Sequence, residues 1–416
     1  MPGSFRVAAD GAGAHPSDML DAPGRIVANG LDSEPVPMML PGAPDPWAPS
    51  EMPAFRSRPP YLMSEMMAAE SALATRLVRR LLSSEPMTSL AEAVRTMANA
   101  GQPIRTTGCG TSEHAAMAIA ELLNETLESP AGREVHPVQA LESLRRPLAD
   151  GLLIAVSHEG GTAATNDAIR AARTAGAQTA LITVGGGSPG AGLAEIVVTT
   201  DEQDQSWCHT VGYLSPLLAG VVLAARLAGT KPDAAALHSL LDTANEPRAA
   251  ANITAGLTGV DRLVVVGSGA DLVSARELAL KVSEGARLPA EALDVESIHH
   301  GWLAAATRWT GLVLVLTDSA SDAVRARATR ALEAAAALSM PASALLGERA
   351  AASIDPALTP AGRMLVPRIA RVRGIAGDLL GAAIPLQLLA ERLARARGVN
   401  PDTLGREDPA QASAHS

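Results

Sequence analysis

Lysine, aromatic residues and cysteine are scarce in this chain of 416 residues. Lys231 and Lys281 are its only lysines, so chemistry that needs a lysine amine has two candidates. Aromatic residues make up 2% of the sequence, which argues against a nucleic-acid stacking platform and predicts an aliphatic core. Cys109 and Cys208 show no disulfide-framework or zinc-ligand spacing. We therefore expect no metal, no cofactor and a reducing, cytoplasmic location.

Charge and hydropathy argue against two further classes of protein. The formal net charge is −10, so a nucleic-acid partner is not expected. The N-terminus has no apolar signal-peptide core, and the most apolar stretch, 211–225, is too short for a bilayer span and reads as a buried helix. No membrane partner is predicted, and a hydrophobic content of 47% is enough for a packed globular protein.

Composition divides the chain into a tail, a helical segment, two domains and a second tail. Residues 1–60 hold 12 of the 29 prolines, which predicts a flexible tail. In the helical segment that follows, a second helix is expected to begin at Thr88 or Ser89. The predicted parts are the tail (1–60), N-terminal helices (61–100), a first domain with the ligand loops (101–240), a second domain with acid–base residues (241–398) and a C-terminal tail (399–416).

From Pro103 onward, β-branched apolar runs alternate with Ala-rich helical runs, which predicts α/β domains with doubly wound parallel sheets. A Gly-x-Gly turn at 108–110 follows a predicted strand and opens a helix, and the same arrangement returns at 267–269, 159 positions later. Ser157 and Thr317 each end a predicted strand and are 160 positions apart. We therefore predict two duplicated, flavodoxin-like domains with flanking helices.

Two loops of the first domain are predicted to bind a ligand, because both follow strands, carry Gly and hydroxyl residues and open helices. Their candidate residues are Cys109, Gly110, Thr111, Ser112, Ser157, His158, Glu159 and Thr162. The corresponding loops of the second domain carry carboxylates and are expected to be mainly structural or to lend residues across an interface. His209 lies in a loop that could border the pocket, although a lone histidine is usually structural.

Acid–base residues gather in the second domain. Glu277, Lys281 and Glu284 have helical spacings of four and three, so they share one helix face. Such a trio is often a solvated salt-bridge ladder, but the intervening residues are apolar and indicate burial. A second cluster ends at His300, and a carboxylate near an imidazole suits proton transfer between carbon and oxygen.

These motifs together resemble sugar isomerase (SIS) domain proteins. The resemblance rests on Cys-Gly-Thr-Ser at 109–112, Ser-x-x-Gly-x-Thr at 157–162, Ala-Leu-Lys-x-x-Glu at 279–284 and His-Gly at 300–301. It covers residues 61–405 and is strongest to the isomerase half of glucosamine-6-phosphate synthase and to amino-sugar-phosphate deaminases and isomerases.

The resemblance implies roles for single residues. Glu284 would be the base that moves a proton between C1 and C2, Lys281 would lie beside it, and His300 would open the sugar ring. Because that histidine often comes from the neighbouring subunit in the family, a homodimer with a shared active site is expected. The ligand loops would hold a small-molecule sugar phosphate or amino sugar.

The departures from the family pattern leave alternatives open. Glu159 stands where the family usually has a serine of the phosphate loop, and the tail after Asn400 lacks the family's closing lysine, where Arg406 could supply charge. The chain has no cysteine before Cys109, so glutamine-dependent synthesis is not expected. The leading expectation is an amino-sugar-phosphate isomerase or deaminase. The alternatives are a non-catalytic sugar-phosphate-binding regulatory module and an isomerase or aminotransferase that acts on an unphosphorylated sugar.

Overall fold

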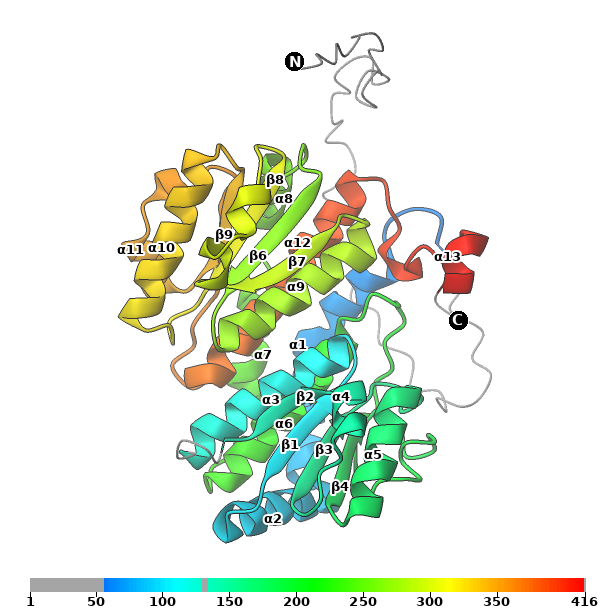
Figure 1. Cartoon of the computed structure of the whole chain (residues 1–416). Coiled ribbons are helices and arrows are strands. Elements are labelled where there is room, and N and C mark those ends of the chain that lie inside the picture. Colours follow the sequence, from blue (N-terminus) through cyan, green and yellow to red (C-terminus); the bar gives the residue numbers. More distant parts are fainter. Residues whose placement is uncertain (1–55, 129–133, 415–416) are drawn as a thin grey trace, which may run out of the picture. The chain divides into compact units, whose positions relative to one another are not determined.

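Two five-stranded parallel sheets, each flanked by helices, form the part of the chain that the structure describes (Figure 1). The structure is a computed structural model, and it describes residues 56–128 and 134–414. The predicted proline-rich tail therefore lies almost entirely outside the described residues.

The first sheet has the strand order β2-β1-β3-β4-β5 and lies between residues 104 and 199. Its three central strands are largely buried, and β3 and β4 are mostly apolar, as expected for a parallel sheet that is covered on both faces. The strands are β1 (Ile104–Gly108), β2 (His136–Gln139), β3 (Leu152–Val156), β4 (Gln178–Thr183) and β5 (Ile196–Thr199).

The second sheet has the order β10-β9-β8-β6-β7, which is the same topology read from its other edge. When the strands of each sheet are numbered in chain order, both sheets have the spatial order 2-1-3-4-5. This is the flavodoxin-like order. The predicted pair of doubly wound domains is confirmed. The strands are β6 (Arg262–Gly267), β7 (Ala290–Asp294), β8 (Thr310–Leu316), β9 (Ala342–Leu346) and β10 (Arg363–Leu365).

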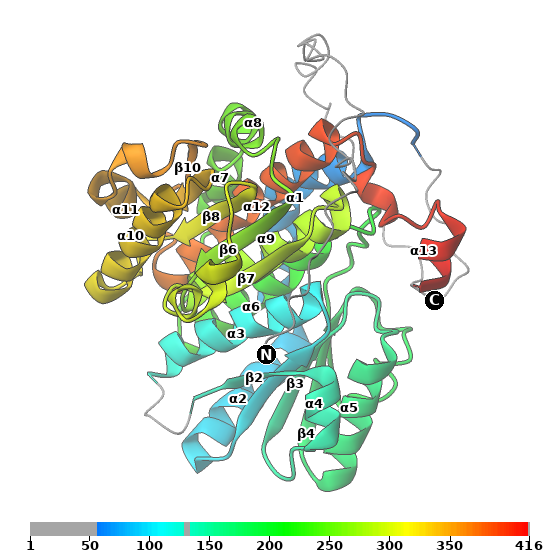
Figure 2. The same ribbon diagram turned by 45° about the horizontal axis from the view of Figure 1, so that its top comes forward.

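Helices cover both sheets and fill the space between them. Figure 2 shows α3 (Thr111–Leu127) of the first domain beside α9 (Ala270–Ala286) of the second. The remaining α-helices are α1 (Leu62–Leu82), α2 (Glu85–Ala100), α4 (Ala140–Arg145), α5 (Ala163–Ala175), α6 (Val211–Leu227), α7 (Ala234–Thr243), α8 (Pro247–Gly256), α10 (Asp322–Ala337), α11 (Glu348–Ser353), α12 (Gly374–Ala396) and α13 (Pro409–Ala414).

The internal similarity extends to backbone geometry. Gly110 and Gly269 precede α3 and α9 with φ, ψ of 57°, −130° and 59°, −129°, a conformation that favours glycine. A Cβ on Gly108 would lie 2.5 Å from the Ser112 carbonyl oxygen, and one on Gly267 would lie 2.5 Å from the equivalent oxygen of Asp271. The Gly-x-Gly pattern therefore serves a tight strand-to-helix turn in both domains.

One described helix, α12, is long and apolar enough to cross a membrane by length and composition. In the structure 78% of its apolar window is buried against the protein. A core helix meets the same criteria, and α12 packs against α9 and α8. The stretch predicted to be a buried helix is also confirmed, because α6 is buried along nearly its whole length.

The boundary predicted for the second helix was wrong. We expected it to begin at Thr88 or Ser89, but α2 begins at Glu85, where the Ser84 hydroxyl caps the Met87 N–H at 3.3 Å. Pro86 in the first turn fits this start, because proline costs no hydrogen bond there.

Candidate active site

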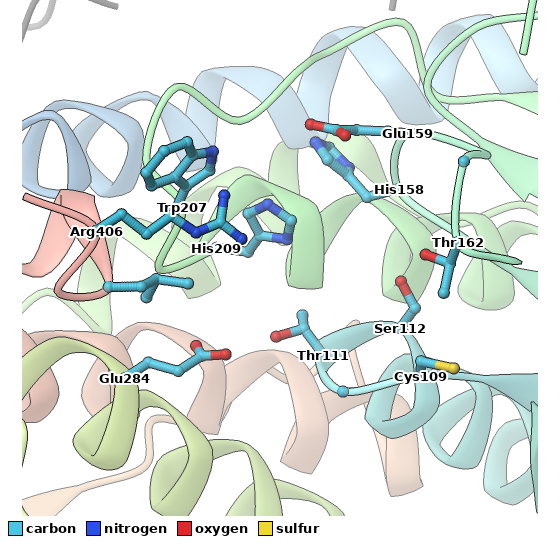
Figure 3. Close-up of a pocket in the computed structure, with 13 residues that line it drawn as sticks. Cys109, Thr111, Ser112, His158, Glu159, Thr162, Trp207, His209, Glu284 and Arg406 are labelled. Atoms are coloured by element: carbon cyan, nitrogen blue, oxygen red, sulfur yellow. The ribbon is translucent and has the colours of Figure 1, made fainter. Parts of the chain in front are cut away.

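A cavity of about 310 Å³ lies where the loops of the first sheet meet α9 and the C-terminal segment (Figure 3). Its size is near the lower end of the range of small-molecule sites. The carboxyl ends of β1 and β3 supply much of its wall, as expected for an open parallel sheet. It is lined by Cys109, Gly110, Thr111, Ser112, His158, Glu159, Gly161, Thr162, Trp207, His209, Glu284, Leu404 and Arg406.

The loop between β1 and α3 presents Cys109 and Ser112 to the cavity. Burial raises the pKa of the Cys109 thiol, which is partly offset by the hydroxyl of Thr165, 3.7 Å from its sulfur. A neutral thiol suits a wall of the pocket better than it suits a nucleophile.

The loop between β3 and α5 contributes His158, Glu159 and Thr162. Burial, with a smaller effect of His209, lowers the pKa of His158 to about 3, so its ring is neutral. The Nε2 atom of His158 accepts a hydrogen bond from the Asp204 N–H at 2.9 Å. Ser157, also a predicted site residue, is buried and is not among the residues that line the cavity.

The segment after β5 carries Trp207 and His209 to the cavity, and Asp204 holds it in shape. The Asp204 carboxylate accepts hydrogen bonds from the N–H groups of Thr210 and Gly212 at 2.6 and 3.0 Å. Burial and Lys281 lower the pKa of His209 to about 4, and its ring lies 4.8 Å from that of His158. The pocket therefore contains two neutral imidazoles.

The C-terminal segment closes one side of the pocket. The Asp402 carboxylate accepts hydrogen bonds from the N–H groups of Leu62 and Met63, both at 2.8 Å, and so caps α1. This anchor places Leu404 and Arg406 at the cavity. The Arg406 guanidinium lies over the Trp207 ring at 4.1 Å.

The predicted trio on α9 forms one connected cluster. Lys281 is fully buried and donates to the Glu284 carboxylate at 2.7 Å and to the Thr111 hydroxyl oxygen at 2.8 Å. Glu277 is also fully buried, 3.4 Å from Lys281 and 2.7 Å from Nδ1 of His114. The cluster links α9 to α3, so it is not a solvated ladder.

The two buried charges of this cluster stabilise each other. Burial alone would raise the pKa of Glu277, but Lys281 and His114 outweigh it and the pKa is lowered. Burial opposes the charge on Lys281, and Glu277 and Glu284 overcome it, so its pKa is raised. Glu284 alone among the three acidic and basic groups lines the pocket, with 25% of its side chain exposed.

His300 does not join the pocket of its own chain. It follows a short 3-10 helix (Ser297–His299), its side chain is 70% exposed, and it pairs with Glu296 at 3.0 Å. The structure thus gathers Glu284, Lys281 and most of the loop candidates, and leaves His300 on the surface.

The loops of the second domain carry carboxylates that bond to neighbouring groups of the same domain. Asp271 is buried and accepts hydrogen bonds from the Thr317 N–H at 2.9 Å and the Thr317 hydroxyl at 2.6 Å. Burial raises the pKa of Asp271 to about 7. Asp271 corresponds to Ser112 of the first domain at the 159-residue spacing, so the second domain has a buried carboxylate where the first has a hydroxyl.

Within residues 56–128 and 134–414, no group of three or more His, Cys, Asp or Glu side chains is arranged to hold a metal ion.

Comparison with known proteins gives a family match for one part of the chain. A family model described as the SIS domain matches residues 97–226. This part of the chain is therefore similar to a SIS domain. The matched region contains β1 to β5, α3 and both ligand loops.

Curated relatives extend the similarity beyond that domain. The chain is 28% identical over 288 residues to a glutamine–fructose-6-phosphate aminotransferase (isomerizing) of Halobacterium salinarum, covering 63% of this chain and 46% of the relative. A protein of the same name from Symbiobacterium thermophilum is 29% identical over 277 residues, covering 62% and 45%. The chain thus spans less than half the length of these relatives and is homologous to their isomerase domain.

Solved structures share the two-domain SIS fold. The C-terminal domain of glucosamine-fructose-6-phosphate aminotransferase from Francisella tularensis has a TM-score of 0.66 at 18% identity, covering 83% of this chain and 99% of its own. Tagatose-6-phosphate ketose/aldose isomerase from Escherichia coli has a TM-score of 0.62 at 16% identity, covering 85% and 98%. At these identities the likeness concerns the fold.

Several residues of the pocket were not predicted from the sequence. No sequence motif marks Trp207 or Leu404 as a site residue. For His209 and Arg406 the sequence suggested a place near the pocket but did not assign them to the site. Both segments reach the pocket through long-range hydrogen bonds of Asp204 and Asp402, which no local pattern announces.

Proposed function

We propose that this protein is a sugar isomerase or amino-sugar deaminase that moves a proton between C1 and C2 of an open-chain sugar, with Glu284 as the base. The observation that carries the proposal is the position of Glu284. It is the carboxylate of the α9 cluster that faces the pocket, with one oxygen held by Lys281 at 2.7 Å. The names of the isomerizing relatives and of the ketose/aldose isomerase with the same fold support this choice.

The geometry gives Glu284 a free acceptor. Oε2 is engaged by Lys281, while Oε1 has no hydrogen-bond partner among the described residues. A positioned carboxylate can take a proton from carbon and return it to the neighbouring carbon, through an enediol-like or enolamine intermediate. Lys281 fixes the orientation of the carboxylate, and its ammonium is too deeply buried to contact the sugar.

Opening of the sugar ring requires proton transfer at the ring oxygen and the C1 hydroxyl, which needs a second acid–base group besides Glu284. We assign ring opening to His300, as the family resemblance implies, and infer that it acts in the pocket of a neighbouring subunit of a homodimer. Its exposed side chain and its absence from the pocket of its own chain support this arrangement. His209 is the in-chain alternative, because its neutral ring lines the pocket.

A binding-only regulatory module is the second candidate function. The surface position of His300 favours it, because a module that only binds needs no imidazole of that kind. It gives no reason, however, for a buried lysine that fixes a carboxylate at the pocket wall.

Solvent-exchange measurements test the proposal. The protein is incubated in D₂O with fructose 6-phosphate, glucosamine 6-phosphate and their unphosphorylated counterparts, and deuterium at C1 and C2 is followed by NMR. We expect exchange with at least one sugar, and a loss of about 10²- to 10⁴-fold in Glu284→Gln. Glu333→Gln, an exposed acid on α10, is the control that should keep full exchange. Exchange that is equal in Glu284→Gln and wild type would exclude Glu284 as the base.

A further inference from the structure

Glu159 is an acid at the pocket that has no partner. It lines the cavity, yet its carboxylate has no hydrogen bond or ion pair to any residue in the described part of the chain. Other acids around the site are satisfied: Asp204 by backbone N–H groups, and Glu277 by Lys281 and His114. Desolvation raises the pKa of Glu159, with Arg406 opposing the shift. The exposed Glu159 carboxylate thus has no direct ion pair or hydrogen bond within the described residues, and Arg406 acts on it only at a distance.

The second domain shows what occupies the corresponding position there. In the first sheet Ile104 of β1 pairs with Leu152 of β3, and in the second sheet Leu263 of β6 pairs with Gly311 of β8. Both members of the second pair lie 159 positions after those of the first. At the ends of β3 and β8, where Ser157 and Thr317 are 160 positions apart, Asp318 is the acid of the second-domain loop, as Glu159 is the acid of the first-domain loop.

Asp318 forms an ion pair with an arginine of the same domain. Its Oδ2 lies 3.0 Å from Nη1 of Arg368, and its Oδ1 accepts a hydrogen bond from the Arg349 N–H at 2.9 Å. The second domain thus supplies a guanidinium from its own chain to the acid at this position. The first domain supplies none to Glu159 among the described residues, and its acid faces a cavity instead.

The charges that line the pocket agree with this comparison. Its charged side chains are Glu159, Glu284 and Arg406. His158 and His209 are neutral, and the charge of Lys281 is taken up by Glu277 and Glu284 beneath the wall. A phosphate dianion bound beside Glu159 would face its carboxylate, and the one guanidinium of the lining already lies over Trp207. A ligand with a positive group suits this lining better.

We propose that the pocket takes a sugar whose end remote from the reacting carbons carries a protonated amine, bound by the Glu159 carboxylate, in place of a phosphate. The inference rests on the proposed function for the reacting end, where Glu284 acts. Figure 3 places Glu159 and Glu284 on opposite sides of the pocket, as two ends of one ligand would require. An ammonium on a carboxylate forms a charge-assisted hydrogen bond, which gives both affinity and orientation.

Binding to a catalytically silent protein tests this inference apart from turnover. The Glu284→Gln variant is titrated calorimetrically with 6-amino-6-deoxy-glucose, glucose and glucose 6-phosphate. We expect the amino sugar to bind about tenfold more tightly than either of the others, or better. The double variant Glu159→Gln/Glu284→Gln should lose this preference, and Glu142→Gln/Glu284→Gln, which changes an exposed acid on α4, should keep it.

Each outcome separates the two proposals. If glucose 6-phosphate binds as tightly as the amino sugar, or Glu159→Gln leaves the preference intact, the ammonium site is refuted while Glu284 can still be the base. If the preference holds but Glu284→Gln retains full turnover, the ligand class stands and the proposed base falls. Glu159 has no partner to lose, so its substitution should leave the melting temperature unchanged, which is measured alongside.

Discussion

Lys281 donates a hydrogen bond to Glu284 across 2.7 Å, although only 1% of the Lys281 side chain is exposed. The same ammonium lies 3.4 Å from the fully buried Glu277. One of the two lysines in the sequence therefore serves both a structural carboxylate and the carboxylate at the pocket. This double role ties the stability of the α3–α9 contact to the shape of the site.

Replacing Lys281 with methionine should destabilise the protein strongly. The substitution leaves Glu277 as a buried acid without its main counter-charge. Removing one partner of a buried ion pair lowers the free energy of unfolding by about 3–5 kcal/mol. Chemical denaturation followed by circular dichroism measures the loss of unfolding free energy.

The double variant Glu277→Gln/Lys281→Met is the matched control for this prediction. It removes both buried charges, so it should recover part of the stability lost in the single variant. It should not recover turnover, because Glu284 remains without its positioning partner. A single variant as stable as wild type would show that Glu277 finds another partner.

The glycines before α3 and α9 should be equally sensitive to alanine. Gly110 and Gly269 adopt positive φ, and a Cβ there has room, so strain alone sets the cost. We expect Gly110→Ala and Gly269→Ala each to lose about 1–3 kcal/mol of unfolding free energy. Gly259→Ala is the control, because its φ is not positive and nothing lies near its Cβ position. Unequal losses at the two turns would contradict the equivalence of the two domains.

Most central strands could be predicted from the sequence because they are largely apolar runs, and so could the apolar edge strand β5, whereas the edge strands β2, β7 and β10 could not. β2 contains Pro137 and reads His-Pro-Val-Gln, β10 has three residues, and β7 reads Ala-Glu-Ala-Leu-Asp within the acid-rich segment. Edge strands are half exposed, so they do not need the apolar pattern that marks a buried strand.

The same division holds for the pocket. Residues on the β1 and β3 loops could be predicted because short Gly/Ser/Thr motifs encode them, and Glu284 because helical spacing puts it beside Lys281. Trp207 and Leu404 belong to segments whose positions depend on long-range hydrogen bonds: the Asp204 N–H donates to Nε2 of His158, and the Asp402 carboxylate accepts from the N–H groups of Leu62 and Met63. Such tertiary contacts leave no period or motif in the sequence.

Two buried groups should move the acid stability of the protein in opposite directions. The pKa of His158 is lowered to about 3, so its contribution to stability is present above pH 6.5 and is lost as the pH falls below that value. The pKa of Asp271 is raised to about 7, so its contribution is present at low pH and is lost as the pH rises toward 7.

Unfolding free energies at pH 7 and pH 5 check both signs. Each group changes stability by about 1.4 kcal/mol per pH unit within its window. On acidification, His158→Gln should lose less stability than wild type, and Asp271→Asn should lose more. Glutamine keeps an acceptor for the Asp204 N–H, and asparagine keeps one for the Thr317 N–H, so both substitutions preserve a hydrogen bond. Shifts of the same sign in both variants would contradict the assigned burial of one group.

Mixed dimers test whether His300 acts on the neighbouring subunit. Glu284→Gln and His300→Ala should each be inactive alone. When the two variants are mixed in equal amounts and their subunits exchange at random, half of all dimers contain one chain of each kind. If the active sites are shared between subunits, each of these heterodimers has one intact site out of two. Mixing should therefore restore about a quarter of wild-type activity.

The arrangement of the two substitutions distinguishes this model from a site built within one chain. If His300 served its own chain, mixing the single variants would restore nothing. Mixing wild type with the double variant Glu284→Gln/His300→Ala reverses the expectation: shared sites leave about a quarter of full activity, whereas independent sites leave about half. If both mixtures behave as independent sites, His300 has no role across an interface, and His209, which already lines the pocket of its own chain, becomes the imidazole to test by substitution.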